Sequence, residues 1–414
     1  MERIFQSLSQ IFLRLKGLIF GSRASDKPIT SAGDNQLPSS VHEVISDDDL
    51  LTEILLRLPV VPTLLLTSVS RRWLSLITDP SFTLRRSEIS YLDPPSGLFI
   101  QKPPPSSVQN AYFEYAYVSY DTKISPKLIT PFPFGSQGNV EIVQSCNGLL
   151  LCRDRPEEYW VYNPSLNRFH RIPERPFWLS ILGIRLVFDP TKSPHYTVMC
   201  SGLRNMYSYS SSSETHNWSD CGAVFTFESG PKFSSGVYCN GAIHWLNPIG
   251  VVHYRLDVNG LLVTSIPTSL TFDAESHPLK YKLFAFGDSL FLVCIVRRLI
   301  SIYSKYLEVY KMRNAYSEWS LKYQVTLKSI TRKFTRSWNI FTQELPSDLL
   351  EIGEGEREED LFLVMKLSGQ VVKYSFVSKT LDVLFDFGSV PLIEPTTIAS
   401  SSSCFPFIAS FATV

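Results

Sequence analysis

The sequence predicts a small all-α segment followed by a large all-β, propeller-like domain, and three observations lead to this fold class. Signals for helix starts and ends crowd into residues 45–86. From about residue 97 onward, short apolar runs are broken by Gly, Pro, Asn and Ser, which is typical of strands and turns. Within that second region, a hairpin-like unit recurs. We therefore expect three helices in residues 45–86 and a β domain in residues 97–414.

Residues 1–44 are expected to form an N-terminal amphipathic stretch and a flexible linker. Apolar residues of the first twenty positions fall on one helical stripe, and residues 21–44 are rich in Ser, Pro and Gly. With Arg3, Arg14 and Lys16, the stripe has three interpretations: a membrane-surface helix, an organelle-import segment, or an extension that is loosely ordered or docked on the body. The longest apolar runs of the chain are too short to cross a bilayer.

Two helices are expected in the first part of residues 45–86. Ser46 is the expected N-cap of the first helix, and three aspartates follow it in the first turn, where carboxylates accept hydrogen bonds from free N–H groups. Pro59 ends this helix, and Pro62 suits the first position of the second.

A third helix is expected between Ser70, a second capping residue, and Asp79-Pro80, which ends it. Together the three helices carry more large apolar side chains than so small a unit buries alone. That surplus has two interpretations: the helices pack on the β domain, or they dock into the helices of a partner.

The β region repeats a unit made of an aromatic strand, a polar turn and a second strand. Its copies recur at intervals of about 45–65 residues, the range expected for four-stranded propeller blades. A hairpin with a polar tip suits the outer pair of strands in a blade. A pair of β-sandwiches is the alternative fold. The copies lie at residues 160–169, 207–218, 252–260, 309–319 and 372–381.

Composition excludes some classes of function. The chain has 414 residues, and Lys+Arg and Asp+Glu number 39 each, so the net charge is zero. A protein built mainly to bind nucleic acid needs a basic surplus. Seven scattered cysteines without a CxxC pair indicate buried, reduced thiols, and we expect a cytoplasmic or nuclear protein.

Residues 45–82 resemble an F-box. The matching pieces are Ile54-Leu55-Leu56-Arg57-Leu58-Pro59, Val69-Ser70-Arg71-Arg72-Trp73 and Asp79-Pro80-Ser81-Phe82. The pattern departs from the family at Ile45-Ser46, where Leu-Pro is usual, and at Val61-Pro62, where Lys-Ser is usual. The resemblance implies docking on a Skp-type adaptor. The residues expected to contact the adaptor or to form the core that shapes the contact are Leu50, Ile54, Leu55, Leu58, Pro59, Leu64, Val69 and Trp73.

The region downstream resembles the F-box-associated domain of plant F-box proteins, which is kelch- or propeller-like. The matching pieces are Ser145-Cys146-Asn147-Gly148-Leu149-Leu150, Trp160-Val161-Tyr162-Asn163-Pro164 and Val237-Tyr238-Cys239-Asn240-Gly241-Ala242-Ile243-His244-Trp245. In physical terms, Asn-Gly tolerates the positive φ of a tight turn ahead of a buried strand. His244 could bind a ligand, but a hydrogen-bonded core histidine is the favoured interpretation.

The sequence contains none of the motifs GxSxG, HExxH, P-loop or GxGxxG after a strand, and its seven histidines show no metal-ligand spacing. We therefore expect a non-catalytic protein without cofactor or metal. The resemblance implies the substrate receptor of a cullin–RING ubiquitin ligase, with an unidentified protein substrate and unknown substrate-binding residues. The alternatives are an interaction scaffold that residues 1–20 attach to a membrane, and a propeller enzyme or sugar-binding module.

Overall fold

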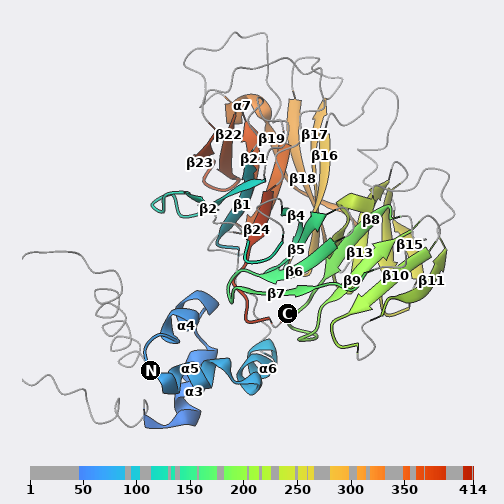
Figure 1. The fold of residues 1–414 in the computed structure, drawn as a ribbon. Helices are drawn as coiled ribbons and strands as arrows, with labels where there is room; N and C mark the ends of the chain where they lie inside the picture. The colour runs from blue at the N-terminus through green and yellow to red at the C-terminus, as the bar shows by residue number, and fades with distance from the viewer. Residues whose placement is uncertain are drawn as a thin grey trace, which may run out of the picture. The chain divides into compact units, whose positions relative to one another are not determined.

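The chain divides into two compact units, Met1–Phe82 and Thr83–Val414. Figure 1 shows the helices and strands of this computed structural model. The amphipathic stretch, the linker and the proline run 103–105 lie outside the described residues. The structure describes residues 46–88, 95–102, 113–128, 132–135, 140–155, 158–174, 181–202, 205–213, 217–224, 233–247, 250–258, 260–264, 280–297, 305–313, 318–331, 348–354, 360–367, 369–387, 404–412 and 414.

Four described helices occupy residues 46–88, so the expectation of three was wrong. They are α3 (Asp48–Leu56), α4 (Val60–Leu66), α5 (Arg71–Thr78) and α6 (Pro80–Glu88). The additional helix begins at Pro80 because Asp79 ends α5 and also caps the next turn. The Asp79 carboxylate accepts a hydrogen bond from the Ser81 N–H at 2.8 Å, and bonds from Ser81 hold its pKa below the usual value. Proline suits the first helical position, where the missing N–H costs nothing.

The ends of the first two helices differ from the expectation by one or two residues. Asp47, and not Ser46, caps α3, because its Oδ1 accepts from the N–H groups of Asp49 and Leu50 at 2.9 and 3.0 Å. Pro59 is the N-cap residue of α4, so Pro62 is the third helical residue and not the first. Its missing N–H still falls in the first turn, where N–H groups have no helical acceptor.

The helical unit has a small core in which α5 contacts both α3 and α4. Ser70 caps α5 as expected, since its Oγ accepts from the Trp73 N–H at 3.2 Å. Trp73 and Ile77 of α5 are buried with Leu51 and Leu55 of α3. Burial of such side chains, each contributing roughly 1.5–3 kcal/mol, stabilises helices that are too short to persist alone.

The second unit is a six-bladed β-propeller, which confirms the propeller prediction and excludes the sandwich alternative. Its described strands form six four-stranded antiparallel sheets. Five of these blades follow the chain in order: β4–β7, β8–β11, β12–β15, β16–β19 and β20–β23. The inner strands of successive blades contact one another, except that a 3₁₀ turn, Phe233–Ser235, makes the contact between β8 and the blade β12–β15.

The strand bounds are as follows. The first three blades in the chain contain β1 (Gly97–Lys102), β2 (Glu114–Ser119), β3 (Lys127–Leu128), β4 (Glu141–Cys146), β5 (Leu149–Arg155), β6 (Glu158–Asn163), β7 (Arg168–Arg171), β8 (Gly183–Val187), β9 (Thr197–Ser201), β10 (Asn205–Ser210) and β11 (Ser219–Val224). The others contain β12 (Val237–Cys239), β13 (Ala242–Asn247), β14 (Gly250–Arg255), β15 (Gly260–Thr264), β16 (Lys280–Phe286), β17 (Ser289–Arg297), β18 (Lys305–Arg313), β19 (Ser320–Thr326), β20 (Asp348–Glu354), β21 (Leu361–Leu367), β22 (Gln370–Ser375) and β23 (Leu381–Asp386). The last strand, β24 (Cys404–Phe407), belongs to the blade of β1, β2 and β3. A short helix, α7 (Leu327–Thr331), follows β19.

The five repeat copies found in the sequence are the outer strand pairs of five blades. They coincide with the hairpins β6–β7, β10–β11, β14–β15, β18–β19 and β22–β23. In two of these hairpins, the first strand is the more buried one: β6 is more buried than β7, and β22 is more buried than β23. The aromatic residues of the repeat therefore mark the inner member of each outer hairpin.

The remaining blade closes the ring by joining the two ends of the propeller sequence. In this sheet β24 pairs antiparallel with β1, and β2 and β3 complete the order β24-β1-β2-β3. Phe99 of β1 lies opposite Phe405 of β24, and both are buried. Because this sheet combines strands from both ends of the propeller sequence, it closes the ring of blades.

Side chains of the inner strands and of the turns that follow them bond neighbouring blades together. The Gln144 amide donates to the Leu186 carbonyl at 2.9 Å and accepts from the Leu186 N–H at 2.8 Å. The two Asn-Gly turns have the expected positive φ, 46° at Asn147 and 50° at Asn240. Their amides donate to the neighbouring blades, at 2.7 Å to the Phe188 carbonyl and at 2.6 Å to the Asp288 carbonyl.

Candidate interaction surfaces

The helical unit exposes several large apolar side chains. The exposed fractions are 48% for Leu50, 42% for Leu65, 37% for Val69 and 44% for Leu74. A unit with a core of this size would otherwise cover such side chains, so their exposure indicates a surface that meets something else.

The residues predicted to dock a partner fall into two groups. Leu55 and Trp73 are buried, so they belong to the core that shapes the surface. The other six reach solvent: Leu50, Pro59 and Val69 are exposed, and Ile54, Leu58 and Leu64 are half-buried. The sequence analysis missed Leu65 and Leu74. Leu74 stands between the exposed Arg71 and Thr78 on one face of α5, and a leucine on a polar face is a usable signal. No such signal marks Leu65, because Thr63 is the one polar residue of α4.

The geometry of α3 places the surface residues on one side of the helix. Leu50 and Ile54 are four residues apart and therefore share a face. Leu51 and Leu55, one position further round, point into the core. The surface of α3 thus carries an apolar stripe directly beside its buried stripe.

Polar contacts hold this surface in place. Arg72 of α5 donates through Nε to Asp48 Oδ1 at 2.7 Å and through Nη2 to the Ser46 carbonyl at 2.7 Å. This bond joins α5 to the start of α3. Thr63, which is fully buried, donates its hydroxyl to the Pro59 carbonyl at 2.9 Å, so its polar group is satisfied inside the core.

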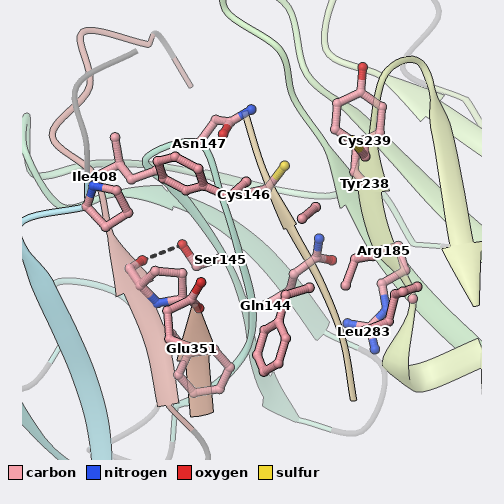
Figure 2. Close-up of a pocket in the computed structure, with 18 of the residues that line it drawn as sticks. Gln144, Ser145, Cys146, Asn147, Arg185, Tyr238, Cys239, Leu283, Glu351 and Ile408 are labelled. Atoms are coloured by element: carbon pink, nitrogen blue, oxygen red, sulfur yellow. Dashed lines mark hydrogen bonds between the residues drawn. The ribbon is translucent and has the colours of Figure 1, made fainter. Parts of the chain in front are cut away.

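The propeller contains a central cavity of ≈790 Å³. Residues from the inner strands of all six blades line it: β4, β8, β12, β16, β20 and β24. Figure 2 shows Gln144, Arg185, Tyr238, Leu283 and Glu351 around this space, with Ser145 hydrogen-bonded across to β24. A pocket of this volume is in the range that holds small molecules, roughly 300–1,000 Å³.

The inner strands carry charged side chains into the cavity wall, among them Arg185, Lys282 and Glu351. Arg185 of β8 is 6% exposed, and burial lowers the pKa of its guanidinium to about 10, so it stays charged at neutral pH. Burial raises the pKa of the Glu351 carboxyl to about 8, although the Lys282 ammonium acts in the opposite direction. Glu351 is therefore mostly protonated near pH 7. Lys282 donates from Nζ to the Leu349 carbonyl at 2.8 Å.

His244 is a core histidine, as the favoured interpretation predicted. It is fully buried, its Nε2 lies 3.0 Å from the Cys239 carbonyl oxygen, and its Nδ1 is hydrogen-bonded to Nδ1 of His253. Burial lowers the pKa of His244 to about 4, and burial with the neighbouring His244 lowers that of His253 to about 3. Both rings are neutral at physiological pH, and neither lines the central cavity.

The described part of the chain holds no cluster of three His, Cys, Asp or Glu side chains suited to a metal ion. Among the same residues, no helix has the length and apolar character needed to span a bilayer. Residues 1–20, for which a membrane-surface helix was one of three interpretations, lie outside this part.

Comparison with known proteins agrees with the sequence resemblance. Residues 47–85 match the F-box domain family. F-box protein At5g07610 of Arabidopsis thaliana is 30% identical over 389 residues, a span covering 85% of this chain and 88% of the relative. The chain belongs to the F-box protein family. F-box protein At5g03970 of the same organism is 23% identical over 268 residues, covering 57% of this chain and 61% of that protein.

Among solved structures, an oligogalacturonate lyase from Vibrio parahaemolyticus aligns with 72% of this F-box protein and 80% of its own chain. The identity is 8% and the TM-score 0.40, so the likeness bears on neither fold nor activity. The fold rests on the six described sheets, and the family on the F-box region and the full-length relative. Proteins of this family are generally substrate receptors without a catalytic domain of their own.

Proposed function

We propose that this chain is the substrate-recognition subunit of a Skp–cullin–F-box ubiquitin ligase. The F-box region docks on a Skp-type adaptor, which connects it to cullin and RING proteins, and the propeller binds a target protein. The observation that carries the proposal is the exposed apolar surface of the helical unit, which coincides with the F-box match. Apolar side chains at 37–48% exposure gain free energy when a partner helix covers them.

The protein acts in this scheme by proximity alone. It holds the target close to a charged ubiquitin-conjugating enzyme, which raises the effective concentration of the reacting groups. The chain supplies no acid, base or nucleophile to the transfer. The seven cysteines are free thiols, five of them buried, which suits work in the reducing cytoplasm or nucleus, where we place the protein.

The test is co-purification of the full chain with a purified Skp adaptor. We expect the wild type to bind and the variants Leu50→Glu, Ile54→Asp and Leu58→Asp to lose at least tenfold in affinity. Leu50→Glu is the sharpest of these, because Leu50 is exposed and lies in the first turn of α3, where a carboxylate stabilises the helix. Its effect on binding is therefore separable from an effect on folding.

A matched control is Val377→Glu, which places the same charge at a 54% exposed apolar position of the propeller. This variant should bind the adaptor as the wild type does. Equal adaptor binding by wild type, Leu50→Glu and Leu58→Asp, all folded, would remove the docking assignment.

A further inference from the structure

We propose that the central cavity of the propeller binds a small organic acid, with the acid's carboxylate held by Arg185. This inference concerns the propeller alone and goes beyond the proposed function. It stands whether or not the F-box region docks on an adaptor.

Arg185 is fixed in place by one contact that leaves most of its donors unused. It is the third residue of β8, and its Nε donates to the Phe233 carbonyl at 3.3 Å. The same carbonyl accepts from the indole N–H of Trp245 at 3.2 Å, which anchors it. Among the described residues, the two terminal nitrogens of Arg185 have no hydrogen-bond acceptor. Figure 2 shows the side chain at the wall of the cavity.

A buried guanidinium without an anion is unfavourable, because it gives up hydration without a compensating partner. Two of the aspartates around the cavity have partners within the chain. Asp189 lies 3.4 Å from the Lys192 ammonium, and Asp288 accepts from the Ser289 hydroxyl at 3.1 Å. Within the described residues, no carboxylate forms an ion pair with Arg185. Arg185 therefore offers terminal N–H donors to whatever enters, whereas the ammonium groups of Lys282 and Lys192 already bond to a carbonyl and a carboxylate of the chain.

The chemistry of the cavity selects a monocarboxylate. Guanidinium binds carboxylate through two parallel N–H···O bonds. Three aspartates also line the cavity (Asp189, Asp288 and Asp348), so a phosphate dianion meets more repulsion than a single carboxylate does. Glu351, on another inner strand, adds little negative charge near neutral pH because burial raises its pKa.

The remaining walls suit an apolar body attached to that carboxylate. Val143, Leu283, Pro406 and Ile408 line the cavity, and Tyr238 adds an aromatic face. The volume of ≈790 Å³ exceeds what a carboxylate alone fills. An acid with an aliphatic or aromatic body thus satisfies both the cation and the apolar walls.

The experiment measures the melting temperature of the full chain with increasing 4-phenylbutyrate, hexanoate and acetate, and with the neutral 4-phenylbutanol. We expect the larger acids to raise the melting temperature of the wild type and the alcohol not to do so. Arg185→Met should bind the acids at least tenfold more weakly, and Arg185→Lys should fall between the two. Lys192→Met, which removes another cation lining the cavity, should respond as the wild type does.

A second readout covers acids outside this series. Wild type and Arg185→Met are purified from the same cell extract, and acids released on denaturation are compared by mass spectrometry. An acid enriched with the wild type alone supports the proposal, as does an Arg185-dependent melting shift. The proposal is overturned if both readouts are absent or are equal in the two proteins. It is also overturned if Arg185→Met melts at a lower temperature than the wild type but responds to the acids in the same way. Arg185 would then have a purely structural role.

Discussion

Asn163 shows how a single side chain secures the propeller. It is fully buried, and its Nδ2 donates to the carbonyls of Ser410 and Ala412 at 3.0 and 2.8 Å. Its Oδ1 accepts from the Ser165 N–H at 2.8 Å, which shapes the turn after β6. Asn163, which belongs to the family-like piece Trp160–Pro164, thus holds the segment that follows β24.

Replacing this amide should destabilise the propeller. We expect Asn163→Ala to lower the free energy of unfolding by about 2–4 kcal/mol, because two buried carbonyls lose their donor. Denaturant unfolding followed by the fluorescence of the buried Trp245 measures it. Asn205→Ala, which removes a bond of 3.1 Å to Asp220, should change stability by less than about 0.5 kcal/mol. Equal effects of the two variants would rule out this role of Asn163.

The buried histidine pair predicts a dependence of stability on pH. The folded pKa values of about 4 and about 3 lie below the ordinary 6.5. Between pH 6.5 and the folded pKa of each histidine, the unfolded chain binds a proton that the folded chain excludes. The stabilising contribution is therefore present above pH 6.5 and is lost as the pH falls toward 4, by up to about 1.4 kcal/mol per pH unit for each histidine.

The measurement is the free energy of unfolding from pH 7 to pH 4.5. The double variant His244→Gln/His253→Gln should show a shallower decline than the wild type. His195→Gln removes an exposed histidine and should keep the wild-type slope. Identical slopes in all three proteins would show that the pair titrates normally.

At the level of elements, local patterns located most of the architecture. The outer hairpins of five blades were predictable because each combines an aromatic strand and a polar turn within a short stretch. Helix ends were less predictable, since Ser46, Asp47 and Asp48 are all acceptable caps by residue type. Only the position of the first turn decides among them, and that position depends on which leucines enter the core.

The α3 cap gives a direct test of this boundary. We expect Asp47→Ala to weaken α3 by about 1 kcal/mol, because two first-turn N–H groups lose their acceptor. Asp47→Asn keeps a capping oxygen and should retain most of the stability. Hydrogen exchange of the α3 amides should accelerate several-fold in the first variant and little in the second. Unchanged exchange in Asp47→Ala would place the cap elsewhere.

The candidate surfaces were predictable only in part. Periodicity identified the apolar residues of the F-box region, but it does not separate a face toward its own core from a face toward a partner. Leu55 and Leu50 therefore looked alike in the sequence, yet one is buried and the other is 48% exposed. Arg185 escaped notice, although an arginine inside the apolar run Gly183–Val187 is a signal for an unusual buried charge.

At the scale of the whole molecule, closure of the ring lay beyond any local pattern. The sixth blade joins β24 to β1, across some 300 residues of chain, and its outer strand β3 has only two residues. The sequence shows no copy of the repeat there, because the outer hairpin β2–β3 ends in so short a strand. The blade count of six became evident only from the sheet pairing.

The chain has two compact units, which suits the substrate receptor that we propose. The F-box region offers an exposed apolar surface, and the propeller offers a central cavity and its loops. A variant in one unit should therefore leave the other folded, since each has its own core.

The central claim is that this chain enters a ligase complex through its F-box region. The most direct measurement is size-exclusion chromatography with light scattering on the full chain mixed with a Skp adaptor and a cullin. We expect one peak with the mass of one copy of each protein, and loss of this chain from the peak when Leu50 is changed to Glu. Elution of adaptor and cullin together, with the folded wild-type chain in a separate peak, would show that the chain does not enter the complex.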